Sequence, residues 1–405
     1  MPGLGGHAGG HAGGHAGGHA GGHAGGHAGP TVLGDSYADS LYADALNRQR
    51  AAVIDTRPEA LKQQWTLRDR PFKVDEKHPL ALNRHVMRWD GWVRRYLAVS
   101  ELIRQMDYVL IPPGETEDGR KQRPTLELTI GEPVSGTTLF RLERPDAKVF
   151  EKQLELVLQW AELREERTSE ILTQIDNQTP FWGTLLPIQA DRLEHTRELL
   201  DIAQEMAVFV EMRFKHELAC WRPCDLSWMV QPMITTPGHG SLPAGHATQS
   251  YVVVAVLKAL LDTVSDDDDA RRSVNQQLER VAARIATNRV VAGLHFPVDN
   301  IAGRILGTVL GEYVVHRCRG RRPPREGREE PEYYRWGAGA FLGGRFDPEA
   351  DFDPDAQPIH TAGHRPAYFD YTPLPVDTPA PVSLLHNLWA AAVDELRRLD
   401  MRFDA

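Results

Sequence analysis

Apolar side chains recur at helical spacing along most of the chain. Over 81–109 they follow one another every three or four residues, which predicts an amphipathic helix. The same spacing predicts long helices over 148–175 and 190–221. The second of these ends before Arg222, because a proline follows and pushes the preceding residue out of the α region.

The second half of the chain continues this helical pattern. After a loop rich in proline and glycine over 224–245, the spacing predicts four more helices. They span 246–264, 270–287, 296–317 and 383–399. Most of 321–380 is rich in proline, glycine, arginine and aspartate, so we expect it to be irregular.

One segment departs from the helical spacing. Leu126, Leu128 and Ile130 alternate with polar residues, a Pro-Val-Ser-Gly sequence interrupts the run, and a second apolar stretch follows over 138–142. This pattern is typical of a β-hairpin. The sequence therefore predicts a mainly α fold of helical bundles with a small β-hairpin.

Composition narrows the functional classes. The chain has 405 residues and a formal net charge of −10, which argues against nucleic acid as a partner. Any anion site must then be a local cluster of cations. Three cysteines are too few for a disulfide framework. The glycines at 337 and 339 open no predicted helix, so they make a poor nucleotide-binding fingerprint.

The chain shows no apolar run of the roughly 20 residues that a membrane span needs. It also begins without the basic and apolar segments of a secretory signal. We therefore expect no membrane partner and a cytoplasmic location. Residues 1–30 repeat His-Ala-Gly-Gly, which indicates a disordered affinity tag or repeat expansion, or else a natural metal-binding tract.

Three segments carry candidate chemistry, and the first pairs two cations. Lys215 and Arg222 are seven residues apart at the end of a predicted helix. On one helix both would lie on the same face, two turns apart, where they suit an anion with several oxygens. Taken alone, the pair is equally typical of solvated surface charge.

In the second segment, Gly245 and His246 lie where a loop becomes a helix. The first N–H groups of a helix have no partner within it and can bind an oxyanion. In the third, His295 precedes a helix, and Asp299 follows one turn later on the same face. A carboxylate behind a histidine fixes its tautomer and raises its basicity. Singly, each histidine could be structural.

Together the segments resemble a known family. Lys-x6-Arg-Pro, then Pro-x-Gly-His, then Arg-x5-His-x3-Asp is the ordered pattern of the vanadium haloperoxidases and the type 2 phosphatidic acid phosphatase superfamily. The likeness covers about 205–320. Two positions depart from it: Ala244 and Asn288 stand where the family has serine. Ala244 cannot make the hydrogen bond to the anion that a serine would make, whereas Asn288 can still donate and accept hydrogen bonds.

The resemblance implies a helical-bundle fold of that type and a vanadate cofactor. It implies that Lys215, Arg222 and Arg289 bind the equatorial oxygens of vanadate or phosphate, together with the Gly245 N–H group. His246 would be the acid/base near the apical oxygen.

The resemblance also implies that His295 bonds to vanadium, or attacks phosphorus in a phosphatase through a phosphohistidine. Asp299 would orient it.

Two enzyme chemistries fit this resemblance. The lack of membrane helices and the long helical region before the motifs favour a vanadium-dependent haloperoxidase, whose partners are hydrogen peroxide and a halide. His239 precedes His246 by seven residues, an offset that resembles the additional histidine of bromoperoxidases. We therefore expect bromide or iodide rather than chloride. The alternatives are an acid phosphatase and a non-catalytic oxyanion-binding member.

The composition shifts predict four parts of the chain. These are a His/Gly-rich segment over 1–30, a helical region with the hairpin over 31–205, an oxyanion-binding helical core over 206–320 and an irregular region over 321–405. The sequence leaves open whether an organic substrate is halogenated and whether the chain forms a homo-oligomer.

Overall fold

The computed structural model describes residues 86–399, with gaps at 88, 116–120, 132–135, 176–177, 189–191, 266, 320–335, 361–363 and 375–383. The histidine repeat over 1–30 lies outside the described residues, so its interpretation stays a prediction, as does the division of the chain into four parts. The described residues belong to one compact unit by their contacts.

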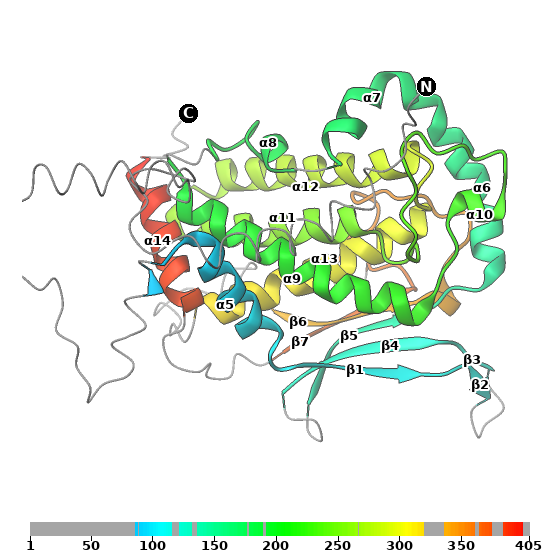
Figure 1. Ribbon diagram of the computed structural model, residues 1–405, viewed down its shortest axis with the longest axis horizontal. Helices are drawn as coiled ribbons and strands as arrows, with labels where there is room; N and C mark the ends of the chain where they lie inside the picture. Colours follow the sequence, from blue (N-terminus) through cyan, green and yellow to red (C-terminus); the bar gives the residue numbers. More distant parts are fainter. Residues whose placement is uncertain are drawn as a thin grey trace, which may run out of the picture. The chain divides into compact units, whose positions relative to one another are not determined.

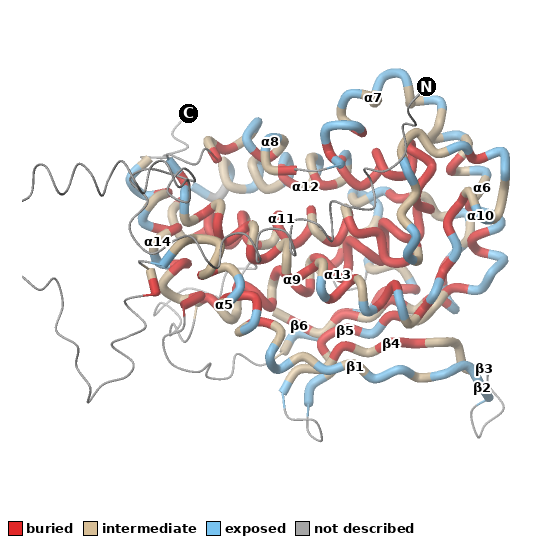
Figure 2. Tube along the Cα trace, viewed as in Figure 1, coloured by how far each residue is buried: buried red, intermediate tan, exposed pale blue. Residues whose placement is uncertain are grey.

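Two long helices form the centre of this unit. Helix α11 (Gly245–Val264) packs along helix α13 (Pro297–Arg319), and both are buried over most of their length (Figures 1 and 2). Gly303, Gly307 and Gly311 recur every four residues along α13 and face α11. A Cβ atom at Gly303 would lie 2.6 Å from the Ala244 carbonyl oxygen, so the glycines allow this close approach.

Four further helices pack around this pair: α5 (Gly91–Ile103), α9 (Glu194–Leu218), α12 (Asp268–Val291) and α14 (Leu384–Arg398). Figure 1 shows α9, α11, α12 and α13 running in similar directions through the bundle. Helices α6 (Ala147–Trp160) and α7 (Arg164–Thr173) contact α12, and α7 is joined to α6 by the 3-10 turn Ala161–Leu163. Two single-turn helices, α8 (Thr179–Trp182) and α10 (Pro223–Leu226), complete the helices that bear on the site.

A five-stranded sheet lies along one side of the helices (Figure 1). Its order is β1-β4-β5-β6-β7, antiparallel except for the parallel pair β5 and β6. The strands are β1 (Met106–Ile111), β4 (Thr125–Ile130), β5 (Thr137–Glu143), β6 (Gly337–Leu342) and β7 (Phe369–Pro373). A separate short hairpin joins β2 (Gly114–Glu115) and β3 (Lys121–Gln122).

The predicted β-hairpin is confirmed as β4 and β5, but the sheet is larger than predicted. Strands β6 and β7 come from the region expected to be irregular. The sequence of β6 is Gly-Ala-Gly-Ala-Phe-Leu, which has little intrinsic strand preference. Its glycines serve packing instead, since a Cβ atom at Gly339 would lie 2.7 Å from a Val309 methyl group on α13.

The mainly helical fold is confirmed, with three changes of boundary. Within the described part of 81–109, the expected helix covers 91–103 before the chain turns into β1, and the helix expected over 148–175 is divided by the turn at 161–163. The helix expected over 190–221 ends at Leu218, because Ala219 adopts a left-handed conformation with φ of 45°. The helices predicted over 246–317 and 383–399 are present within a few residues.

Helix α11 is the only described helix that is long and apolar enough to cross a membrane. In the structure, 72% of its most apolar window is buried against the rest of the protein. Helix α11 is therefore apolar because it is buried among the surrounding helices.

Candidate active site

The C-terminal part of α9 contributes Lys215, which is 2% exposed. Its ammonium group donates hydrogen bonds to the carbonyl oxygens of Ser241 at 3.1 Å and Gly240 at 3.4 Å, and to that of Pro243. Burial lowers the pKa of Lys215 to about 8, although the nearby Glu211 carboxyl opposes this shift. The loop before α11 thus fixes a buried cation by backbone contacts.

Arg222 reaches the same loop by a different route from the one predicted. The prediction that Lys215 and Arg222 share a helix face is wrong, because α9 ends at Leu218 and Arg222 is an extended residue at the start of α10. Its guanidinium nevertheless donates to the Gly240 carbonyl oxygen at 3.3 Å and to that of Leu294 at 2.9 Å. A chain reversal, not helical periodicity, brings the two cations together.

His295 lies between α12 and α13 and is held on both ring nitrogens. Its Nδ1 lies 3.1 Å from an Asp299 carboxylate oxygen, and its Nε2 lies 2.9 Å from the Arg222 guanidinium. Arginine only donates, so Nε2 accepts and Nδ1 carries the proton. Burial, then the positive charge of Arg222, lowers the pKa of His295 well below its usual value, so the ring is neutral.

The predicted contact between Asp299 and His295 is therefore present. The same carboxylate oxygen of Asp299 also accepts from the Phe296 backbone N–H at 3.0 Å, and its second oxygen lies 3.4 Å from the Ser241 hydroxyl. Asp299 is 0% exposed, and burial raises the pKa of its carboxyl to about 6. These contacts fix the orientation of the His295 ring.

The N-terminus of α11 lies beside these residues. Gly245 is its first residue, and Ala244 before it has no side chain that could cap the helix. A Cβ atom at Gly245 would lie 2.6 Å from an oxygen of the Glu211 carboxyl, so a larger residue would have to displace that carboxyl. The N–H groups of this first turn have no acceptor within the helix.

Glu211 itself was not predicted as a site residue. It is 2% exposed, and one of its oxygens accepts from the Gln249 amide at 3.1 Å. The other oxygen has no partner among the described residues. Burial raises the pKa of Glu211 to about 7, although the Lys215 charge opposes the shift. The site therefore holds a carboxyl group that titrates near neutral pH.

His246 follows Gly245, and its Nε2 lies 2.9 Å from the Gln174 carbonyl oxygen. Because a carbonyl only accepts, Nε2 carries the proton and Nδ1 keeps its lone pair. Burial, followed by the charge of Arg289, lowers the pKa of His246 to about 3. The ring is therefore a neutral group next to several cations.

Arg289, near the end of α12, completes the group of cations. It is 1% exposed and donates to the Ile171 carbonyl oxygen at 2.9 Å and to the Gln174 side-chain oxygen at 3.1 Å. Its Nε and Nη1 atoms are buried with no partner among the described residues. Unpaired guanidinium N–H groups at this place suit an anion with several oxygens.

Gln174, just beyond α7, is a second residue that the sequence analysis missed. Its side-chain oxygen accepts from both Arg289 and Asn288, and its backbone oxygen accepts from His246. Gln174 thereby connects His246 to Arg289, both of which were predicted as site residues. No motif marks this position, because its role depends on the packing of α7 against α12, more than a hundred residues away in sequence.

His239 also lies at the site, as its offset from His246 predicted. The side chain belongs to an exposed residue, and its Nδ1 lies 3.2 Å from the Arg222 guanidinium. Although the residue is exposed as a whole, its ring is partly enclosed beside Arg222, and this desolvation together with the charge of Lys215 lowers the pKa of His239 to about 4. His239 is thus a neutral residue at the solvent side of Arg222.

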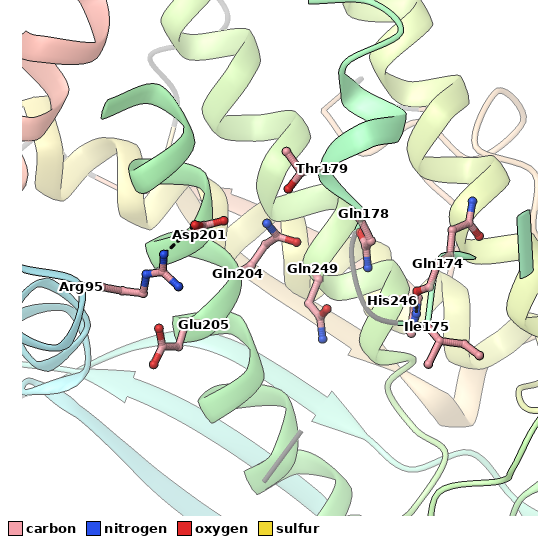
Figure 3. A pocket seen from close by; sticks show the side chains of 10 residues that line it. All are labelled: Arg95, Gln174, Ile175, Gln178, Thr179, Asp201, Gln204, Glu205, His246 and Gln249. Atoms are coloured by element: carbon pink, nitrogen blue, oxygen red, sulfur yellow. Dashed lines mark hydrogen bonds and ion pairs between the residues drawn. The ribbon is translucent and has the colours of Figure 1, made fainter. Parts of the chain in front are cut away.

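A cavity of about 220 Å³ opens next to His246 (Figure 3). Side chains of α5, α9, α11 and the segment after α7 line it, and most of them are polar. Its lining is formed by Arg95, Gln174, Ile175, Gln178, Thr179, Asp201, Gln204, Glu205, His246 and Gln249. The cavity gives the acid/base candidate a route to molecules from solvent.

The site as a whole can bind an oxyanion. Lys215, Arg222 and Arg289 contribute three buried cations, and the first turn of α11 adds N–H groups. Within the described part of the chain, no three His, Cys, Asp or Glu side chains are grouped to hold a bare metal ion. The cationic and N–H donors present suit an anion with several oxygens.

Comparison with known proteins agrees with this chemistry. Residues 202–323 match the PAP2 superfamily. The chain is 30% identical, over 101 residues, to the vanadium-dependent bromoperoxidase of Ascophyllum nodosum. This match covers 20% of the chain and 18% of the bromoperoxidase, so it spans less than a fifth of that relative's own length.

Among solved structures, a similarity extends to the transmembrane PAP2 type phosphatidylglycerolphosphate phosphatase of Bacillus subtilis. It covers 42% of this chain and 85% of the phosphatase, at 17% identity and a TM-score of 0.33. The matched segment 202–323 contains every predicted site residue from Lys215 to Asp299.

Proposed function

We propose that this chain, whose residues 202–323 match the PAP2 superfamily, is a vanadium-dependent haloperoxidase that oxidises bromide or iodide with hydrogen peroxide. The observation that carries the proposal is the similarity to a vanadium-dependent bromoperoxidase, combined with the convergence of all the motif residues on one site. The mainly helical fold is of PAP2 type, with the five-stranded sheet in addition.

Vanadate as the occupant is supported by the Nε and Nη1 atoms of Arg289, which are buried and have no partner among the described residues. Lys215, Arg222 and Arg289 would balance its negative charge, and the Gly245 N–H would donate to one oxygen. The Nε2 atom of His295 would bind vanadium. When bound, vanadate supplies a Lewis-acidic centre that activates hydrogen peroxide.

The protein groups then divide the remaining work. Asp299 holds the proton on Nδ1 of His295, which leaves the lone pair on Nε2 and raises its basicity. In this structure that lone pair accepts from the Arg222 guanidinium, which would turn to the anion when Nε2 binds vanadium. The Nε2–H group of His246 donates a hydrogen bond to the Gln174 carbonyl oxygen, so the Nδ1 lone pair can accept a proton from hydrogen peroxide. Its low pKa keeps that lone pair free at neutral pH.

His239 bears on the choice of halide. Its polar ring lies beside Arg222. In addition, Ala244 cannot make the hydrogen bond that a serine would make to the cofactor, so we expect the cofactor to be less strongly activated. Chloride is the hardest of the three halides to oxidise, so we expect bromide and iodide turnover with little chloride turnover. Steady-state assays with each halide at matched peroxide test this, and halide rates that stay unchanged in His239→Phe would remove His239 from the account.

A phosphatase is the second candidate, and the pairing of His295 with Asp299 favours it as well. A neutral histidine oriented by a carboxylate can attack phosphorus and form a phosphohistidine, while a second histidine protonates the leaving group. The same three cations would bind the phosphoryl oxygens.

Parallel assays separate the candidates. The protein is tested with and without added vanadate for bromide-dependent peroxide consumption and for p-nitrophenyl phosphate hydrolysis. We expect bromide oxidation only with vanadate, and no hydrolysis above background. Hydrolysis that vanadate inhibits, without bromide oxidation, would assign a phosphatase. Vanadate binding without either activity would assign a non-catalytic oxyanion-binding protein.

A further inference from the structure

The cavity beside His246 has a charge distribution that the reaction at the oxyanion site does not explain. Three charged side chains line it, and two of them neutralise each other: Arg95 pairs with Asp201 at 2.7 Å (Figure 3). The third, Glu205, makes no hydrogen bond or ion pair with any described residue. A half-buried carboxylate that has no hydrogen bond or ion pair within the described residues therefore remains in the cavity wall, although the charge of Arg95 acts on it as well as on Asp201.

The rest of the wall consists mainly of side-chain amides. Gln174, Gln178, Gln204 and Gln249 line it together with the Thr179 hydroxyl, and Ile175 is the one aliphatic side chain in the lining. An apolar molecule would gain little here, since it would displace water from amides without replacing their hydrogen bonds. The cavity suits a polar organic molecule.

Helix geometry gives the approximate distance between the Glu205 carboxylate and the oxyanion site beside His246. Glu205 precedes Glu211 by six residues on α9, a rise of about 9 Å with a turn of about 120° around the helix axis. The Glu211 carboxyl lies against Gly245, next to His246. The distance from Glu205 to the oxyanion site is therefore on the order of 10 Å, and a molecule that bridges it spans this distance less the hydrogen bonds of about 3 Å at its ends.

We propose that this cavity binds an organic amine, with its ammonium group paired to Glu205 and an electron-rich ring directed towards His246. This inference rests on the proposed haloperoxidase function for its chemistry. A ring carbon would attack the bromine of hypobromous acid, so that a C–Br bond forms and the Br–O bond breaks. The ring proton and the departing hydroxide leave as water.

Two phenols of the same size provide the test. Tyramine carries an ammonium group, and tyrosol carries a hydroxyl in its place. Binding of each is measured by calorimetry to the full chain without vanadate, peroxide or bromide. We expect tyramine to bind about tenfold more tightly than tyrosol, and Glu205→Gln to abolish this preference. Glu205→Asp should retain part of it, because the charge remains.

Glu194→Gln is the matched control, since it removes the same charge from an exposed position of α9 outside the cavity. Equal affinities for the two phenols, or a tyramine preference that survives Glu205→Gln, would overturn the proposal whatever the peroxidase assays show. Competition at limiting peroxide adds the second readout. If bromide oxidation is present but both phenols are brominated equally, the proposed function stands and this inference fails.

Discussion

The two sides of the site are held in different ways. On the lysine side, formed by Lys215, Arg222 and His295, the contacts run mainly to backbone carbonyl oxygens of 240–243 and of Leu294. The glutamine side is formed by Gln174, His246 and Arg289. Here Gln174 accepts hydrogen bonds from both His246 and Arg289.

This difference decides how much each side can change. The donors of the lysine side are occupied by a fixed loop, whereas Arg289 on the glutamine side keeps two buried nitrogens without partners among the described residues. We therefore expect the lysine side to hold the anion in a fixed position. We expect the glutamine side to offer the remaining free N–H donors and the group that transfers protons beside the cavity. Substitutions on the two sides should have effects of different kinds.

The largest expected difference separates the two histidines. His295→Ala removes the proposed ligand of vanadium, so we expect tight vanadate binding to be lost. His246→Ala should retain vanadate and lower turnover by about two orders of magnitude or more, the usual contribution of a general acid/base. Equilibrium dialysis with radioactive or spectroscopically detected vanadate, beside bromide assays, tests both. Equal retention of vanadate in the two variants would contradict the division of roles.

A charge placed on the glutamine side should have the next largest effect. Gln174→Glu adds a carboxylate beside Arg289 and Asn288 with little change of shape. Because this charge opposes a bound anion, we expect vanadate affinity to fall about tenfold. Gln178→Glu is the control, since Gln178 also lines the cavity but bonds to Ser250 rather than to Arg289. A similar loss in both variants would mean that Gln174 has no special relation to the site.

The residue before α11 predicts a smaller change in the opposite direction. Ala244→Ser supplies a hydroxyl at the first cap of the helix, where an anion oxygen or a first-turn N–H can bond to it. A hydrogen bond to a charged group is worth about 1.5–3 kcal/mol, so vanadate should bind about ten- to a hundredfold more tightly. A raised melting temperature without tighter vanadate binding would show that the hydroxyl caps the helix instead.

The pH dependence of anion binding should show the smallest effect. As pH rises through about 7, Glu211 gains a negative charge, and as it rises through about 8, Lys215 loses its positive charge. Both changes oppose an anion, so affinity for molybdate, whose charge is constant in this range, should fall several-fold with rising pH. Glu211→Gln should remove the first part of the fall. Unchanged pH dependence in this variant would exclude Glu211 from anion binding.

The sequence predicts the two sides of the site unequally. The residues of the lysine side, with Gly245, His246 and Arg289, belong to an ordered motif, and the contact of His295 with Asp299 agrees with their spacing of four residues at the start of α13. The shared helix face of Lys215 and Arg222 does not exist, because the left-handed turn at Ala219 has no signal such as glycine.

Gln174 and Glu211 were not predictable for a different reason. Their roles arise from contacts between helices that are distant in the chain, where no local pattern distinguishes them from surface residues. The sheet shows the same limit. Strand β4 alternates clearly, but β6 becomes a strand only because β5 and α13 provide partners from elsewhere in the sequence.

The central claim is that one vanadate, held by both sides of the site, produces the activity. Titration of the protein with vanadate, followed by bromide-dependent peroxide consumption, tests it most directly. The account predicts no activity before vanadate is added and saturation at one vanadium per chain, with no activation in His295→Ala. Bromide oxidation without vanadate, or full vanadate occupancy without bromide oxidation, would contradict it.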